Sequence, residues 1–160
     1  MATAGIKPIM PYFAGRYRIE GMREGASQTF DAGAALVRST AGDGTGRRVV
    51  VATDATLGIT AAANALVGFA AEDASGTTNA LISVYCADAQ TEFVGNICTA
   101  SVADQPTDVD FVGVAAGLVP DTTNAVWRVD MADTAANKFV MITRLYPGDS
   151  VGDTNHGINR

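Results

Sequence analysis

Short runs of apolar and β-branched residues alternate with turns rich in Gly, Asp and Asn along most of this 160-residue chain. Runs of about four to eight such residues between turn residues are typical of β-strands. The pattern predicts strands at residues 35–38, 47–53, 79–86, 92–98, 112–119, 125–130 and 138–146. The last has the strongest β pattern, and the one before it alternates so that Trp127 lies on one face. We therefore expect a mainly β protein.

The stretch 66–76 in the middle of the chain is compatible with a strand or with a helix. Its apolar run contains one glycine and stops at an acidic turn, which favours a strand. The alternative is an Ala-rich helix over residues 60–72, because Ala is the best helix former. Asn64, the β-branched Val67 and Gly68 weaken that helix, so we adopt the strand. Gly68 then marks a bulge or a point of tight packing.

The residues Asp88–Thr91 separate two predicted strands and suggest a hairpin turn. In that hairpin Cys86 ends the first strand, and Cys98 lies about six residues along the returning one, or ~20 Å away. A disulfide needs Cα atoms within ~7 Å. We therefore predict that the two cysteines are not joined and are buried as small hydrophobic residues.

Residues 1–26 differ in character from the rest of the chain. They contain four basic and two acidic residues, a balance of +2, which leaves −8 for the remainder of a chain whose net charge is −6. Pro8 and Pro11 exclude a helix interior. One interpretation is a first strand or a frayed terminus. The other is an extended arm that binds a partner.

We adopt the arm as the prediction, with a β-rich domain over residues 27–160. Tyrosine and arginine are enriched at protein interfaces. The predicted partner-binding residues of the arm are Tyr12, Phe13, Arg16, Tyr17, Arg18 and Ile19. If this is correct, deleting residues 2–24 weakens partner binding and leaves the domain folded.

Composition bears on the class of partner and on the compartment. A net charge of −6 disfavours nucleic acid as a partner, because nucleic acid binds basic faces. No apolar run approaches the ~20 residues of a membrane helix, so we expect no membrane partner. The N-terminus lacks the pattern of a signal peptide, and two cysteines fit a reducing compartment.

Candidate chemistry is sparse. Asp104, Asp108 and Asp110 lie close enough in sequence to suggest a calcium loop, but the bidentate glutamate of such loops is missing. The Asp43-Gly-Thr-Gly sequence is interpreted as a turn, although it resembles an aspartic-protease loop. The only histidine, His156, has no cysteine or histidine partner at metal-binding spacing. We expect no enzyme activity, no metal and no cofactor.

The order of three segments resembles a known family. Residues 25–37 contain Gln28-Thr29-Phe30 followed by Gly33-Ala34, the strand 47–53 comes next, and the phrase 66–75 follows. This order resembles the head decoration proteins, or capsid cement proteins, of tailed bacteriophages. Phe69 stands where Ile or Leu is commoner in that family. The resemblance extends over residues 25–155.

The resemblance implies a compact β-barrel or β-tulip domain preceded by an extended N-terminal arm. It implies homotrimers on the exterior of the virion head that bind the major capsid protein and neighbouring trimers and stabilise the capsid lattice. The chain would be made in the cytoplasm of a bacterial host. A core of small side chains also favours a symmetric oligomer. Two alternatives stay open: another virion β-protein, such as a tail-tube, head-completion or fibre component, and a carbohydrate-binding module or enzyme.

Overall fold

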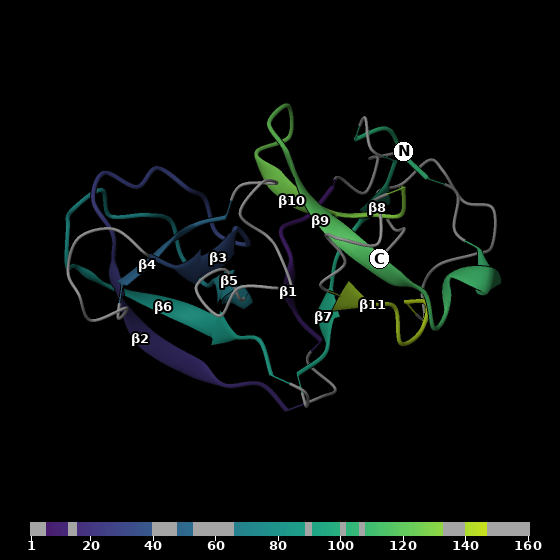
Figure 1. Ribbon diagram of the computed structural model, residues 1–160, viewed down its shortest axis with the longest axis horizontal. Helices are drawn as coiled ribbons and strands as arrows, with labels where there is room; N and C mark the ends of the chain where they lie inside the picture. The colour runs from purple at the N-terminus through teal and green to yellow at the C-terminus, as the bar shows by residue number, and fades with distance from the viewer. Residues whose placement is uncertain are drawn as a thin grey trace, which may run out of the picture.

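The computed structural model describes residues 6–12, 16–39, 48–52, 66–88, 91–99, 102–105, 108–132 and 140–146. The predictions made for Phe13, the turn at Asp43 and His156 fall outside these residues. The described chain is mainly β, which confirms the predicted fold class. Figure 1 shows two groups of strands side by side along the long axis, a barrel and a second sheet.

The first group is a closed barrel of five strands. Its order is β2 (Ile19–Glu24), β4 (Arg48–Val51), β3 (Ala35–Arg38), β5 (Leu66–Ala70) and β6 (Leu81–Cys86). β2 runs parallel to β4, and the other described pairs are antiparallel. Four of these strands were predicted from their apolar pattern, and β5 confirms the strand over the helix at residues 66–70. The barrel also confirms the closed β architecture that the resemblance implies.

The structure places residues 19–24, the last part of the predicted arm, in the barrel. β2 pairs along its length with β6, and its last residue, Glu24, is fully buried. The Glu24 carboxylate accepts hydrogen bonds from the backbone N–H groups of Ser75 and Gly76, at 2.8 and 2.9 Å. Residues 19–24 are therefore a first barrel strand, the interpretation that was set aside, and deleting residues 2–24 would remove that strand.

The second group contains a sheet of four strands. Its order is β11 (Val140–Met141), β9 (Ala115–Asp121), β10 (Val126–Asp130) and β8 (Ile97–Cys98). β9 and β10 form a hairpin, and β8 runs parallel to β10. A separate pair joins β1 (Met10–Pro11) to β7 (Phe93–Val94). The predicted strand at 138–146 is much shorter in the described residues: β11 pairs with β9, and the Ile142 backbone continues the hydrogen bonding to Gly113 and Val114.

The predicted hairpin of residues 79–86 with 92–98 does not form. Thr91 does turn back on Asp88, because its N–H donates to the Asp88 carbonyl at 3.3 Å. However, β6 pairs with β2 and β5, and the chain leaves the barrel after the turn to form β7 and β8. Cys86 and Cys98 end up in different sheets, and both are free and buried.

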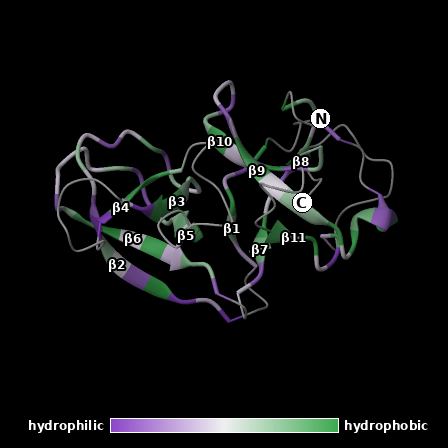
Figure 2. Ribbon diagram, in the orientation of Figure 1, coloured by the Kyte–Doolittle hydropathy of each residue, from purple (hydrophilic) through white to green (hydrophobic). Residues whose placement is uncertain are grey.

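One hydrophobic core connects the barrel to the second group. Phe69 of β5 packs on Phe93 of β7, with ring centroids 4.7 Å apart. The same buried cluster includes Leu118 of β9 and Trp127 of β10. Figure 2 colours β1, β5 and β7, near the junction of the two groups, mostly as hydrophobic. The barrel is therefore covered on one side by the second group and open on the other.

Candidate interaction surface

A row of side chains crosses four barrel strands on one face. Ala35 pairs with Phe69, Phe69 with Tyr85, and Tyr85 with Ile19. Directly opposed residues of antiparallel strands share a face of the sheet. Exposure rises along this row, from 0% at Ala35 and 1% at Phe69 to 49% at Ile19. The face that the second group covers at Phe69 is thus open at β2.

Further exposed apolar side chains extend this open end. The Tyr17 ring packs edge-on against Tyr85, with centroids 5.9 Å apart, and stays 44% exposed. Leu81 lies on the same face of β6 as Tyr85 and is 67% exposed. We call this set the β2–β6 strip, formed by Tyr17, Ile19, Leu81 and Tyr85. Exposed apolar groups gathered on one face mark interaction sites, and tyrosine is a frequent anchor there.

Arginines flank the β2–β6 strip. Arg16, Arg18 and Arg23 are all exposed. Arg18 forms an ion pair with Glu20 at 3.3 Å. A hydrogen bond with the Cys86 thiol, and then the charge of Glu20, raise the pKa of Arg18, so this guanidinium stays charged. The strip is an apolar surface whose fringe contains three arginines and the Glu20 carboxylate that pairs with Arg18, on a chain whose net charge is −6.

The structure separates the predicted partner-binding residues into two sets. Tyr12 contacts its own chain: its ring packs edge-on against Tyr146, Arg144 lies 4.4 Å above it, and its N–H donates to the Glu92 carbonyl at 2.8 Å. By contrast, the exposed set of Arg16, Tyr17, Arg18 and Ile19 lies together at the strip. Their role in binding a partner stays a prediction.

Sequence reasoning missed Leu81 and Tyr85 as parts of the surface. Both were assigned to a strand, and the alternation of residues 81–86 places them on one face with Ser83. Only the pairing of β6 with β2 places Tyr85 opposite Ile19 and Leu81 opposite Arg23. The only signal in the sequence was Leu81, a large aliphatic residue at the start of a predicted strand. Such a residue alone does not indicate a binding site.

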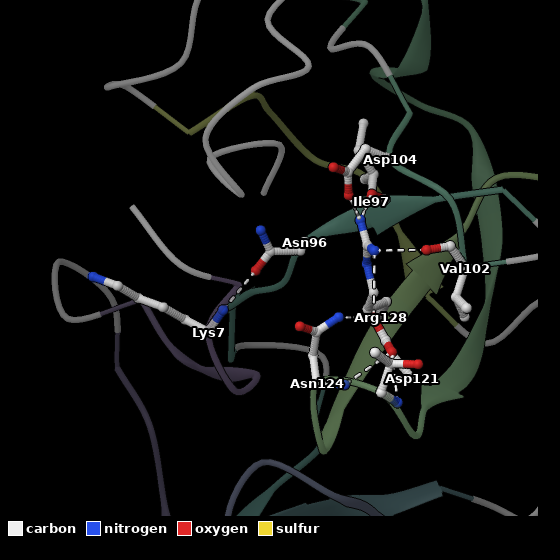
Figure 3. Close-up of polar contacts among 9 residues, drawn as sticks. Lys7, Asn96, Ile97, Val102, Asp104, Asp121, Asn124 and Arg128 are labelled. Atoms are coloured by element: carbon white, nitrogen blue, oxygen red, sulfur yellow. Dashed lines mark hydrogen bonds and ion pairs between the residues drawn. The ribbon is translucent and has the colours of Figure 1, made fainter. Parts of the chain in front are cut away.

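A buried arginine holds a cluster of charges in the second group of strands. Arg128 of β10 is 2% exposed and donates to the carbonyls of Val102 and Ile97, both at 2.8 Å, and to the Asp104 carboxylate at 2.7 Å (Figure 3). Asp121 forms a further ion pair with it at 3.5 Å. These contacts connect β8, the following loop and the β9–β10 hairpin. The cluster stabilises the second sheet, with Arg128 and Asp121 buried and the Asp104 side chain 46% exposed.

The three aspartates that suggested a calcium loop have other contacts. Asp104 is bound to Arg128. Asp108 precedes the short helix η2 (Val109–Phe111), and its carboxylate accepts from the Asp110 N–H at 3.0 Å. Within the described ranges, no three His, Cys, Asp or Glu side chains are grouped as metal ligands. The loop is organised by an arginine and a helix cap.

A cleft of about 340 Å³ lies at the junction of the two groups. Its described walls are largely apolar and include Leu66, Phe69 and Leu118. The polar rim includes Glu92, which is paired with Arg144. This cleft continues the core between the groups, and the β2–β6 strip lies apart from it on β2 and β6.

No protein-family model, curated protein or solved structure matches this chain. In the part of the chain that the structure describes, no helix is long and apolar enough to cross a membrane.

Proposed function

We propose that this chain is a structural virion protein that binds the outer surface of a tailed-phage capsid as a homotrimer and cements the lattice of major capsid protein. The β2–β6 strip is the observation that carries the proposal. It presents exposed aromatic and aliphatic side chains, such as Tyr17 and Ile19, within a fringe of arginines. Such a surface fits another subunit of the virion, either the major capsid protein or a second copy of this chain.

The barrel suits a cementing role because its strands form a closed ring of pairs. Closure removes exposed strand edges, which otherwise promote indiscriminate pairing between chains. Contacts with other subunits then depend on side chains of the outer faces. Many copies of a cement protein lie close together on a capsid, so the absence of exposed barrel edges helps to prevent strand pairing between them.

A trimer binds a lattice more tightly than one copy does. When three copies are linked, the second and third contacts form at high effective concentration, so modest single contacts add to strong overall binding. Each trimer that engages several capsid subunits resists their separation. The proposed activity is mechanical and requires no enzyme chemistry, metal or cofactor.

Binding to isolated heads tests the proposal. Purified protein is incubated with phage heads that lack it and sedimented with them. The wild type is expected to bind saturably, at stoichiometric numbers over the head surface. A variant with Tyr17→Ser and Ile19→Ser is expected to bind about tenfold or more weakly, because it loses apolar area at the strip.

Met141→Ser is the matched control, because Met141 is 63% exposed and lies outside the strip. It is expected to bind as the wild type does. Failure of the wild type to bind heads contradicts the proposal. Saturation at a few copies per head would favour the alternative of a tail, head-completion or fibre component.

A further inference from the structure

We infer that the occupant of the β2–β6 strip is a second copy of this chain, which contributes an apolar and acidic knob from its second group of strands. The contact between two copies is argued from the two surfaces themselves; only the arrangement of three copies in a ring rests on the proposed function. The knob consists of Val109 and Val112 with the adjacent Asp108 and Asp110, and we call it the valine knob.

The valine knob presents its apolar side chains to solvent on a defined turn. Val109 is 58% exposed and Val112 is 47% exposed. The Val112 N–H donates to the Val109 carbonyl at 3.2 Å, and Asp108 caps the start of the turn. The two valines are thus held near each other before any partner binds, which lowers the entropy cost of association.

The knob and the strip have complementary charges. Asp108 and Asp110 adjoin the valines, whereas Arg16, Arg18 and Arg23 flank the strip. Both surfaces combine exposed aliphatic groups with charged neighbours: the strip has three arginines, of which Arg18 is already paired with Glu20, and the knob has two aspartates. Apolar contact between two such surfaces brings opposite charges together at the rim, which orients the partners and speeds their encounter. A second copy of this chain carries both the knob and the strip, so no other protein is needed to supply the complementary surface.

The two surfaces lie at opposite ends of one molecule. β2 is at the left of Figure 1, and the turn of η2, drawn in green, is at the right-hand end. One copy therefore cannot cover its own strip with its own knob. Contact between different surfaces of successive copies is heterologous and closes into a ring when the rotation permits. In the proposed trimer, each copy would give its knob to one neighbour and its strip to the other.

Sedimentation velocity on the full chain, without heads, tests the inference. The strip variant is Ile19→Ser, the knob variant is Val109→Ser, and Met141→Ser is the control. The wild type and the control are expected to self-associate with rising concentration. Each single-surface variant is expected to dissociate about tenfold to a hundredfold more readily, since burial of one aliphatic side chain is lost. Circular dichroism verifies that each variant is folded.

Mixing the variants gives the decisive measurement. The strip variant keeps an intact knob, and the knob variant keeps an intact strip. At a concentration where each alone is monomeric, an equal mixture is expected to form a two-chain complex through the one intact pair of surfaces. A mixture that stays monomeric contradicts the inference, as does a wild type that is monomeric at its highest soluble concentration.

Exchanging the charges of two rim residues distinguishes a loss of charge pairing between copies from a loss of folding. Arg16→Asp and Asp110→Arg are each expected to weaken association, and the two changes in one chain are expected to restore it. Absence of this rescue would overturn the assigned charge pairing. A wild type that self-associates through these surfaces but does not bind heads would refute the proposed function and leave the inference standing. A chain that binds heads but is monomeric in solution would refute the inference and leave head binding, as the proposed function requires, standing.

Discussion

Phe69 of β5 and Phe93 of β7 pack against each other with ring centroids 4.7 Å apart and planes inclined at 57°. Phe69 is 1% exposed and belongs to the core cluster that also includes Leu118 of the second sheet. This contact connects the barrel to the second group of strands. The two groups therefore share one core, which makes the position of the open β2 face fixed relative to the rest of the molecule.

Phe69→Ala is expected to lower the free energy of unfolding by about 3–5 kcal/mol, because it removes a buried aromatic ring and leaves a cavity. Urea denaturation followed by circular dichroism measures the change. Met141→Ala is the control, since its side chain is 63% exposed. It is expected to change stability by less than about 0.5 kcal/mol. Equal effects of the two substitutions would contradict the shared core.

Gly68 is a point of tight packing in β5, as its place in an apolar run predicted. A Cβ at this position would lie 2.0 Å from the carbonyl oxygen of Tyr85, so the backbone of β6 would have to move. Gly68→Ala is expected to destabilise the protein by several kcal/mol or to prevent folding. At Gly21 a Cβ would meet only Leu81, at 3.9 Å, and Gly21→Ala is expected to be nearly neutral. Thermal melting of both variants compares them, and equal melting would refute this assignment.

Asp121 is expected to make stability depend on pH in the acid range. Burial alone would raise the pKa of its carboxyl, but hydrogen bonds from Asn124 and Thr123 and the charge of Arg128 outweigh burial and lower the pKa. A lowered pKa stabilises the fold above the unfolded value of about 3.9, and this stabilisation is lost as the pH falls through the folded value.

The variant Asp121→Asn isolates this contribution. It is expected to be less stable than the wild type near neutral pH, with a difference that narrows as the pH falls below about 4. Urea denaturation of both proteins across the acid range measures the difference. Parallel curves for the two proteins would show that the carboxylate is not stabilised by its partners.

Both cysteine thiols are expected to react slowly in the folded protein. Burial raises the pKa of Cys86 and raises the pKa of Cys98 to about 12, although the charge of Arg128 opposes the latter shift. The thiolate is the reactive form, so little is present near neutral pH. Iodoacetamide labelling followed by mass spectrometry should modify both cysteines only after unfolding. Rapid labelling of the native chain, or a peptide pair linked by a disulfide, would contradict the structure.

The local sequence pattern was sufficient to predict strands that are rich in β-branched, aromatic or other apolar residues. β4 and β6 are rich in β-branched and aromatic residues, and β5 is apolar with Gly68 at its close contact. β2 was missed because its sequence, Ile-Glu-Gly-Met-Arg-Glu, gives no such signal. Its buried Glu24 is tolerated only because Ser75 and Gly76, far away in sequence, donate hydrogen bonds to it.

Long-range pairing explains the other differences. A turn at Asp88 predicts pairing of neighbouring strands, whereas β6 is paired on both sides within the barrel. The candidate surface was half predicted for the same reason. Tyr17 and Ile19 were recognised by residue type, but the contribution of Leu81 depends on the register between β2 and β6. Tyr12 was predicted to bind a partner because its contacts within the chain, Arg144 and Tyr146, are distant in sequence and could not be foreseen.

If the proposed function is right, a phage particle carries this protein, and cryo-electron microscopy of that particle is the most direct test. We predict density for the five-stranded barrel, repeated over the exterior of the head at three-fold and quasi-three-fold positions, with the β2–β6 strip covered by a neighbouring copy. Density at a single vertex, in the tail or inside the head would contradict the claim that the protein cements the capsid lattice. A strip open to solvent in every copy would contradict the role assigned to this surface.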